Sequence, residues 1–215
     1  MNSVELSDYI RLNFKPTARS ISMRKPVFGV GVNNADYMQQ PSTVGGRLTC
    51  PAYRAWKSIM SRSYNEKFHK IEPAYSSVVV ASEWVGFMNF RKWWILNYVS
   101  GYHLDKDIIG SGKVYGPNDC IYIPQWLNAF VMKGESKRGN SPTGVSKDTR
   151  SARFVAQCNN PITNKREFVG YFSTEVKARD AYLERKIQHA TSLKITMDNI
   201  DIRIYPNVIN IIKKG

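Results

Sequence analysis

The segment GVSKDTRSARFVAQCNN at residues 144–160 decides the fold of the C-terminal half, together with REFVGYFS at 166–173 and TEVKARDAYLERKIQHA at 174–190. In the first segment two sets of residues alternate, Arg153, Val155 and Gln157 on one face and Phe154, Ala156 and Cys158 on the other. A period of two is typical of a β-strand with one face in water. The sequence therefore predicts strands in the first two segments, joined by turns at 148–151 and 159–165.

The third of these segments has the pattern of a helix. Ser173 or Thr174 can cap its first turn, because a hydroxyl oxygen there accepts a hydrogen bond from a free backbone N–H. Ala178, Ala181 and Tyr182 then share one face of the helix, and we expect this face to pack against the strands. A small sheet packed on one helix is the predicted fold of residues 143–192.

Farther upstream, two segments have apolar residues at helical spacing. PAYRAWKSIMSRSYN at 51–65 begins with Pro51, which suits a first helical turn, and SEWVGFMNFRKWWILNYV at 82–99 begins with Ser82 as an expected cap. Strands are expected in YSSVVVA at 75–81 and in CIYI at 120–123, and a helix in PQWLNAFV at 124–131. The aromatic stripe at 82–99 is expected in the core rather than on a base-stacking surface; its members are Trp84, Phe87, Phe90 and Trp94.

Shifts in composition divide the chain into five parts. Residues 1–50 are expected to be an N-terminal extension that is partly loop, 51–132 a first domain, and the polar segment 133–142 a linker. Residues 143–192 form the C-terminal domain and 193–215 a tail. In the tail Ile200, Ile202 and Ile204 alternate, which predicts an edge strand before a short last helix.

The charge balance points to an anionic partner. The 215 residues include 31 Lys and Arg against 17 Asp and Glu, a formal net charge of +14. Nucleic acid is a frequent partner of chains with such an excess, because it relieves their self-repulsion. The three cysteines lie far apart without a CxxC pair, so we expect buried thiols rather than disulfides or a zinc site.

The sequence predicts a cytoplasmic protein without a membrane partner. No apolar run approaches the ~20 residues that span a bilayer, and the N-terminus lacks the order of a signal peptide.

The segment LDKDIIGSGKVYGPNDCIYIPQWLN at 104–128 carries polar residues in an ordered pattern. It resembles the core of phage HNH endonucleases, in which a compact strand–turn–strand–helix unit holds a divalent metal beside the scissile phosphate. Asp105 falls at the family's aspartate ligand, and Asn128, four residues after Pro124, at its last His or Asn ligand. Scaffold positions of the family are matched by Tyr115, Pro117 and Cys120. Flanking motifs extend the resemblance over about residues 27–187; they comprise Trp56, Met60, Arg62, Tyr64, Glu83, Trp84, Phe87, Asn89, Phe90 and Trp93.

The segment departs from the family at the catalytic base. Lys106 stands where the general-base histidine is found, and a protonated lysine holds a phosphate but accepts no proton. Asp119 aligns with the family's central asparagine, one residue after Asn118. Two arrangements therefore stay open. In one, Asp105, Lys106 and Asn128 act as in the family alignment. In the other, His103 is the base, with Asp105 and Asp107 near a Mg²⁺ or Mn²⁺ ion, because residues two apart share a strand face.

Residues 144–186 resemble the ethylene-response-factor (Apetala-type) DNA-binding domain, which also occurs as an appendage of phage homing endonucleases. The match comprises Gly144, Val145, Phe154, Ala156, Gly170, Phe172, Thr174, Ala178, Ala181 and Tyr182, with Phe154 where a tryptophan is common. The resemblance implies a three-stranded antiparallel sheet that enters the major groove of DNA, which a β-ribbon fits. The expected DNA-binding residues are Lys147, Arg150, Arg153, Gln157, Lys165 and Arg166, with Lys113 in the central loop.

These observations predict an α+β chain in which an HNH (ββα-metal) domain precedes the small sheet. The favoured function is metal-dependent hydrolysis of double-stranded DNA, with Mg²⁺ or Mn²⁺ as cofactor, in the cytoplasm of an infected bacterial host. An alternative is an inactive HNH-derived DNA-binding protein that acts as a phage regulator or assembly component with other phage or host proteins. A third hypothesis, RNA or ribosome binding, rests on charge and exposed aromatic residues alone.

Overall fold

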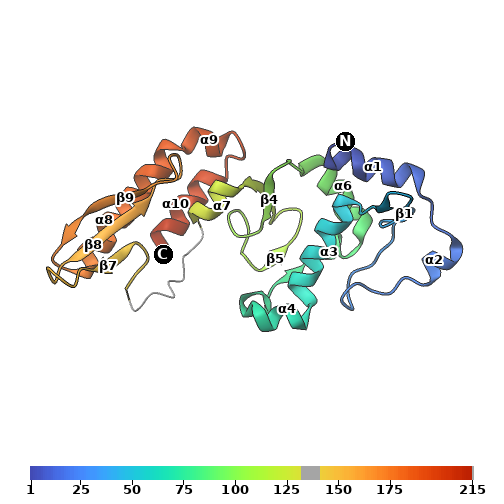
Figure 1. Cartoon of the computed structure of the whole chain (residues 1–215), viewed down its shortest axis with the longest axis horizontal. Coiled ribbons are helices and arrows are strands. Elements are labelled where there is room, and N and C mark those ends of the chain that lie inside the picture. The colour runs from blue at the N-terminus through green and yellow to red at the C-terminus, as the bar shows by residue number, and fades with distance from the viewer. Residues whose placement is uncertain (132–140, 215) are drawn as a thin grey trace. The chain divides into compact units, whose positions relative to one another are not determined.

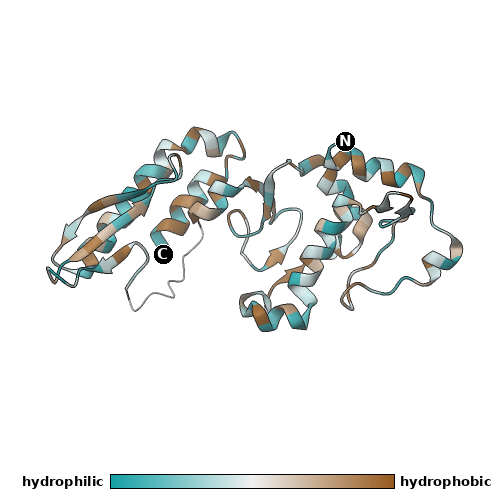
Figure 2. Cartoon of the chain, viewed as in Figure 1, coloured by the Kyte–Doolittle hydropathy of each residue, from teal (hydrophilic) through white to brown (hydrophobic). Residues whose placement is uncertain are grey.

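The computed structural model describes residues 1–131 and 141–214. It divides into two compact units, Met1–Tyr122 and Ile123–Gly215 (Figure 1). Both contain helices and short strands, so the α+β class is confirmed. The expected linker at 133–142 lies almost wholly outside the described residues. Within the described part of the chain no helix is long and apolar enough to cross a membrane, and hydrophobic and hydrophilic residues interleave along the helices (Figure 2).

The first unit is mainly helical. Its helices are α1 (Ser3–Asn13), α2 (Ala18–Ser22), α3 (Pro51–Tyr64), α4 (Glu66–Ile71), α5 (Ser82–Val85) and α6 (Phe87–Asn97), with a 3₁₀ turn at Pro73–Tyr75. Its short strands are β1 (Ser42–Thr43), β2 (Gly46–Arg47), β3 (Val79–Val80), β4 (Tyr102–Asp105), β5 (Val114–Tyr115) and the start of β6 (Ile121–Pro124).

An aromatic core holds this unit together. Trp56, Trp84, Phe87, Phe90 and Trp94 are each at most 1% exposed, which confirms that the predicted stripe belongs to the core. The indole Nε1 of Trp56 donates a hydrogen bond to the carbonyl oxygen of Trp84 (2.7 Å), so the polar edge of this ring is satisfied inside the core.

The N-terminal fifty residues belong to the same compact unit. Asn2 and Glu5 form a capping box at the start of α1, and Ile10 from this helix is fully buried in the aromatic core together with Tyr37. The buried guanidinium of Arg91 on α6 binds the carboxylate of Asp8 on α1. The extension is therefore part of the folded core of the first unit.

The helix predicted at 82–99 is interrupted. The backbone of Val32 inserts at Gly86: Val32 N–H donates to Val85 O (2.9 Å), and Phe87 N–H donates to Val32 O (3.0 Å). The carbonyl that would continue the helix is thus already occupied, and the chain divides into α5 and α6. Ser82 is the first helical residue rather than the cap, which is Ala81, so that prediction is wrong. The strand predicted at 75–81 is reduced to β3 because Pro73–Tyr75 forms the 3₁₀ turn.

The second unit contains the predicted sheet and helix. It comprises α7 (Gln125–Val131), β7 (Val145–Lys147), β8 (Phe154–Asn159), β9 (Arg166–Phe172), α8 (Glu175–Ser192), α9 (Lys194–Asp198) and α10 (Ile204–Lys214). The strands form an antiparallel sheet in the order β7-β8-β9. Helix α8 covers one face and buries Ala178 and Tyr182 against Val145, Ala156 and Cys158. Thr174 is the cap, its Oγ1 accepting from Lys177 N–H (3.3 Å).

A β-bulge in β9 changes which side chains share a face. Gln157 faces Phe168 whereas Ala156 faces Gly170, so Val169 is an extra residue on β9. Simple alternation would place Phe168 and Tyr171 on opposite faces. The bulge places both on the face away from α8, where they are 56% and 54% exposed.

The tail is helical where an edge strand was predicted. The carboxylate of Asp201 accepts hydrogen bonds from the backbone N–H and the guanidinium of Arg203, which closes a turn just before α10. Ile204 is then buried at the start of a helical stripe with Val208 and Ile212, while Ile202 is 77% exposed. The edge-strand prediction is therefore wrong, and the short last helix is confirmed.

Gly144 provides a test of this packing. It has φ +79°, and a Cβ there would lie 2.2 Å from Tyr182 Cδ2. We expect Gly144→Ala to destabilise the second unit by about 2 kcal/mol or more, because a methyl group overpacks this site. Hydrogen exchange of the β8 amides would measure the loss, and exchange of the α6 amides would measure the effect of a substitution in the first unit. Gly101→Ala is the matched control, since Gly101 has φ +80° with open space around it. Equal destabilisation of the two variants would contradict the steric argument.

Candidate functional site

The loop between β4 and β6 carries most of the sequence-predicted catalytic residues. The parallel pair β3–β5 attaches this loop to the first unit: Val79 N–H donates to Lys113 O and Ala81 N–H to Tyr115 O, both at 2.9 Å. Strand β4 is paired with β6, and α7 follows β6 along the chain. The chain thus runs from strand to loop to strand to helix between β4 and α7.

Asp105 is the organising residue of the loop. Its side chain is buried, and Oδ1 accepts hydrogen bonds from Asp107 N–H (2.9 Å) and Ile108 N–H (2.8 Å). Among the described residues Oδ2 has no hydrogen-bond partner. Burial raises the pKa of Asp105, while the two backbone hydrogen bonds oppose that rise.

Lys106 is buried beside Asp105 with its charge compensated. Its Nζ lies 2.8 Å from Asp107 Oδ1 and 5.3 and 5.8 Å from the ring centroids of Tyr75 and Tyr115. A carboxylate and two ring faces stabilise an ammonium ion, so the contacts of Lys106 are those that hold an ammonium group in place.

Two further side chains complete the surroundings of Lys106. The hydroxyl of Tyr115 accepts a hydrogen bond from Arg62 Nη1 (3.3 Å), and burial raises the pKa of this phenol. Cys120 is also buried, which raises the pKa of its thiol to about 12, with Asp119 and Asp105 adding to the rise. All three cysteines are buried free thiols, as expected.

The remaining predicted catalytic residues lie apart from the buried pair. His103 and Asn118 are exposed. His103 does not share the buried environment of Asp105, although the two residues lie on the same strand. Asp107 lies beyond the end of β4, and its carboxylate is bound by Lys106. Asp119 is half-buried at a turn in which its N–H donates to Gly116 O (3.2 Å).

The first unit alone does not assemble a three-ligand metal site from its His, Cys, Asp and Glu residues, and no such group occurs anywhere in the described ranges 1–131 and 141–214. Asn128, the other expected ligand, is on α7 and belongs to the second unit. Asp105 Oδ2 is thus a buried-residue carboxylate oxygen without a hydrogen-bond partner among residues 1–131 and 141–214.

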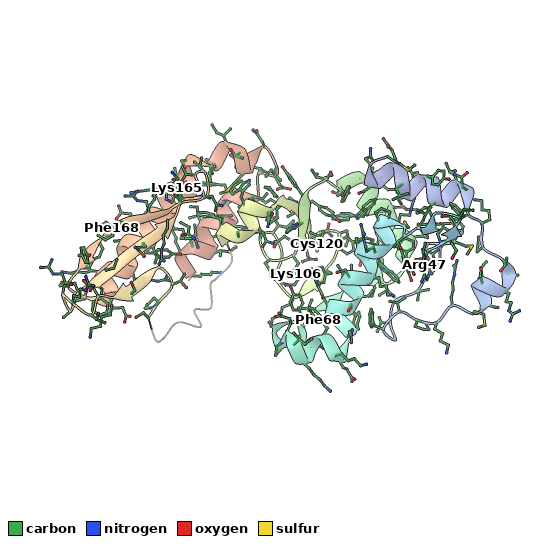
Figure 3. The ribbon with its side chains drawn as sticks, in the orientation of Figure 1. Arg47, Phe68, Lys106, Cys120, Lys165 and Phe168 are labelled. Carbon is green, nitrogen blue, oxygen red and sulfur yellow. The ribbon has the colours of Figure 1, made fainter. Side chains whose placement is uncertain are left out.

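The predicted DNA-binding residues border the exposed face of the sheet in the second unit. Gln157 and Arg166 lie on this face, and Arg153 precedes β8 in the same alternation. Arg150 and Lys165 lie in the two turns. Lys147 ends the edge strand β7 opposite Phe154, so the register assigns it to the face that α8 covers and not to the exposed face. Lys113, in contrast, is an exposed loop residue of the first unit. Figure 3 labels Lys165 and Phe168 on this sheet, and Lys106 and Cys120 in the loop of the first unit.

The sequence pattern did not predict the aromatic pair Phe168 and Tyr171 on the exposed face of the sheet. The rings of Phe168 and Tyr171 lie 5.2 Å apart in an edge-to-face contact at 61°. The bulge at Val169 hid them from a period-two pattern. A signal was present in Gly170, because glycine inside a strand often marks a bulge. Tyr75, which lies over Lys106, was missed because it was assigned to a strand.

Comparison of this chain with protein-family models, with curated proteins and with solved structures found no match.

The pKa of Asp105 gives a test of the loop. Because burial raises it, ionisation of Asp105 lowers the stability of the folded protein as the pH rises above the ordinary value of 3.8. An amide keeps the Oδ1 acceptor and does not ionise. We therefore expect Asp105→Asn to be at least as stable as the wild type at pH 7, with an advantage that disappears below pH 3.8.

Asp105→Ala is the contrasting variant. It leaves the N–H groups of Asp107 and Ile108 without their acceptor, and we expect a loss of about 2 kcal/mol. Urea titrations followed by tryptophan fluorescence would measure both variants, because Trp56, Trp84, Trp93 and Trp94 all belong to the first unit. An Asn variant that is less stable than the Ala variant at pH 7 would refute this account of the turn.

Proposed function

We propose that the chain acts on double-stranded DNA, and that the exposed face of the β7-β8-β9 sheet binds the duplex. The observation that carries this proposal is the composition of that face. Arg166, Gln157, Phe168 and Tyr171 lie on it with Arg153 at its border, and none of the residues that the strand register assigns to it is acidic. Such a face supplies the contacts that a base edge and a phosphate require.

Each residue type on the face has a partner in the major groove. An arginine can bind guanine O6 and N7 with two hydrogen bonds, and a glutamine can bind adenine in the same way. An exposed aromatic ring can contact the methyl group of thymine. The groove is wide enough for a β-ribbon, and helix α8 leaves this face of the sheet open because it packs on the other one.

The one carboxylate within strand β9 is held away from the face. Glu167 accepts a hydrogen bond from Asn160 Nδ2 (2.7 Å) and lies 3.3 Å from Arg185 Nη1. Its position in the register is opposite Cys158, on the face that α8 covers. The positive charge of Arg166 and Arg153 is therefore available to DNA phosphates.

Metal-dependent cleavage of the bound DNA is the second candidate function, with the loop around Asp105 as its site. The observation in its favour is that two backbone N–H groups fix Asp105 Oδ1, while Oδ2 has no hydrogen-bond partner in the described part of the chain. Mg²⁺ needs only one or two protein carboxylates when water and substrate phosphates complete its coordination. When bound, such an ion stabilises negative charge on the phosphate. Asp105 is the residue that would hold it, and Lys106 adds a fixed positive charge.

The binding proposal predicts the effect of two substitutions. Arg153→Ala and Arg166→Ala should each weaken DNA binding, and each should lower the slope of log affinity against log salt by about one if the lost contact is to a phosphate. Fluorescence anisotropy with a labelled duplex at several salt concentrations would measure both quantities. Lys177→Ala on α8 is the matched control, because Lys177 is exposed on the helix that covers the opposite face. Unchanged affinity in both arginine variants would remove the sheet face from the proposal.

The cleavage proposal is tested with supercoiled plasmid in Mg²⁺ or Mn²⁺. We expect nicked or linear product from the wild type, its loss with EDTA, and its loss in Asp105→Asn, which keeps the turn but removes the carboxylate. His103→Gln tests the alternative base: loss of cleavage assigns that role to His103, and retained cleavage excludes it.

Salt-sensitive binding without cleavage in either metal would overturn the nuclease proposal and leave a DNA-binding protein. Tight binding to structured RNA but not to duplex DNA would overturn both proposals.

A further inference from the structure

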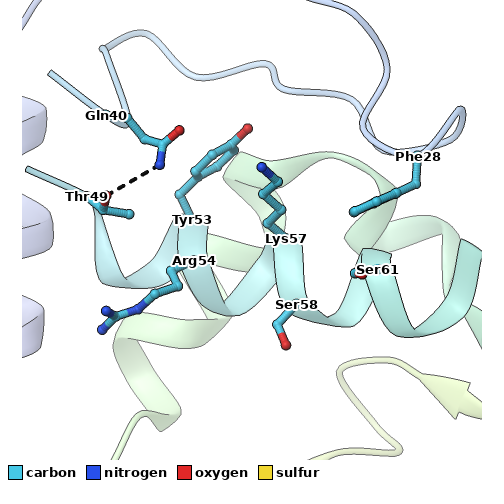
Figure 4. A pocket seen from close by; sticks show the side chains of 8 residues that line it. All are labelled: Phe28, Gln40, Thr49, Tyr53, Arg54, Lys57, Ser58 and Ser61. Carbon is cyan, nitrogen blue, oxygen red and sulfur yellow. Dashed lines mark hydrogen bonds between the residues drawn. The ribbon is translucent and has the colours of Figure 1, made fainter. Parts of the chain in front are cut away.

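A pocket in the first unit lies far along the chain from both candidate sites. It is formed on α3 by Tyr53, Arg54, Lys57, Ser58 and Ser61, and is completed by Phe28, Gln40 and Thr49 (Figure 4). Its volume is about 420 Å³, within the range of about 300–1,000 Å³ that small-molecule sites occupy. Neither the sheet face nor the loop around Asp105 contributes to it.

The helical repeat of α3 produces the polar wall of this pocket. Trp56, Ile59 and Met60 turn into the core, which leaves positions 54, 57, 58 and 61 on the outer side of the helix. That side carries two cations and two hydroxyl groups. The pattern alone describes a solvated helix face, so the pocket needs further observations before it is interpreted as a binding site.

The first such observation is the charge. None of the eight lining residues is acidic. The side chains of Arg54 and Lys57 form no hydrogen bond or ion pair with any described residue. Two like charges three positions apart on a helix repel each other, and a bound anion would remove that repulsion.

The second observation is the backbone at Phe28. This residue has φ +50° and is followed by Gly29 at φ +78°. A bulky residue in the left-handed region is strained by about 1 kcal/mol or more. The strained turn directs the aromatic ring into the pocket wall. Lys57 extends between the rings of Phe28 and Tyr53, whereas Arg54 points away from them along the rim (Figure 4).

The third observation is a fixed polar side chain at the far wall. Gln40 Nε2 donates to Thr49 Oγ1 (3.4 Å), and its Oε1 accepts from Arg47 Nη2 (3.0 Å). The hydroxyl of Tyr53 is a donor at neutral pH, as for any tyrosine, and burial raises its pKa further. A cation, a phenol and an amide thus line an open space with an aromatic ring in its wall.

We propose that this pocket binds a nucleotide unit, with its phosphate at Lys57 and its base against Phe28. The phosphate neutralises the unpaired cation, and the flat base covers the ring that the strained turn presents. The unit can belong to a free nucleotide or to a single nucleic-acid strand, since the two share this chemistry. The inference is independent of duplex binding by the sheet.

Binding would be measured by isothermal titration calorimetry on the full chain. The probes are adenosine monophosphate, a 5′-phosphorylated trinucleotide and inorganic phosphate. We expect Lys57→Gln to weaken binding of both nucleotide probes by about tenfold or more, the usual effect of losing a hydrogen bond to a charged group. Lys92→Gln on α6 is the matched control, because Lys92 is an exposed lysine outside the pocket.

Phe28→Leu tests the contact with the base separately from the contact with the phosphate. It keeps an apolar side chain and removes the ring, so we expect about fivefold weaker nucleotide binding with unchanged binding of inorganic phosphate. Tighter binding of the trinucleotide than of the monophosphate would assign the pocket to a strand, and the reverse to a free nucleotide. Equal losses in Lys57→Gln and Lys92→Gln, or no binding of either nucleotide by the wild type at millimolar concentration, would overturn the proposal. Neither result bears on duplex binding by the sheet, which the Arg153 and Arg166 variants test separately.

Discussion

The two hydrogen bonds that Asp105 Oδ1 accepts from Asp107 and Ile108 are the constraint on which the central loop depends. They stop strand β4 and turn the chain, so that Lys106 enters the interior while Asp107 stays near the surface. The Lys106 ammonium then binds Asp107 from inside. Without this turn, the lysine would have to be buried without a carboxylate partner, which is costly for a charged group.

The turn at Asp105 also decides which side chain of the loop lies where the family has its catalytic base. A buried cation between Asp107 and two tyrosine rings occupies the place that the resemblance gives to a general base. The carboxylate pair that sequence spacing suggested is thereby divided: Asp107 neutralises Lys106, and Asp105 keeps one oxygen without a partner. The proposed metal-binding role therefore depends on Asp105, and Lys106 supplies the positive charge beside it.

Local patterns predicted the elements whose stability is local. The helix at Pro51–Tyr64, the antiparallel strands and the Thr174-capped helix depend on nearby residues, and all were found. The break at Gly86 was not predicted because its cause is Val32, more than fifty residues away in sequence. The bulge at Val169 depends on strand register, and the contacts around Lys106 depend on long-range packing. The periodicity of the sequence predicts neither. The edge strand predicted in the tail was wrong for a local reason, because Asp201 forms a turn within the segment in which the isoleucines alternate.

The structure shows which of the cations behind the net charge of +14 have a carboxylate partner. Arg91, Lys106 and Arg185 each have a carboxylate partner within their own unit, so they contribute to the fold and not to an external field. Arg153 and Arg166 at the sheet, and Arg54 and Lys57 at the pocket, have none among the described residues. An uncompensated charge destabilises the compact chain unless an anion shares it. The sheet face and the pocket each carry two such cations, and the two proposals of nucleic-acid and nucleotide binding both rest on an anion that would share this charge.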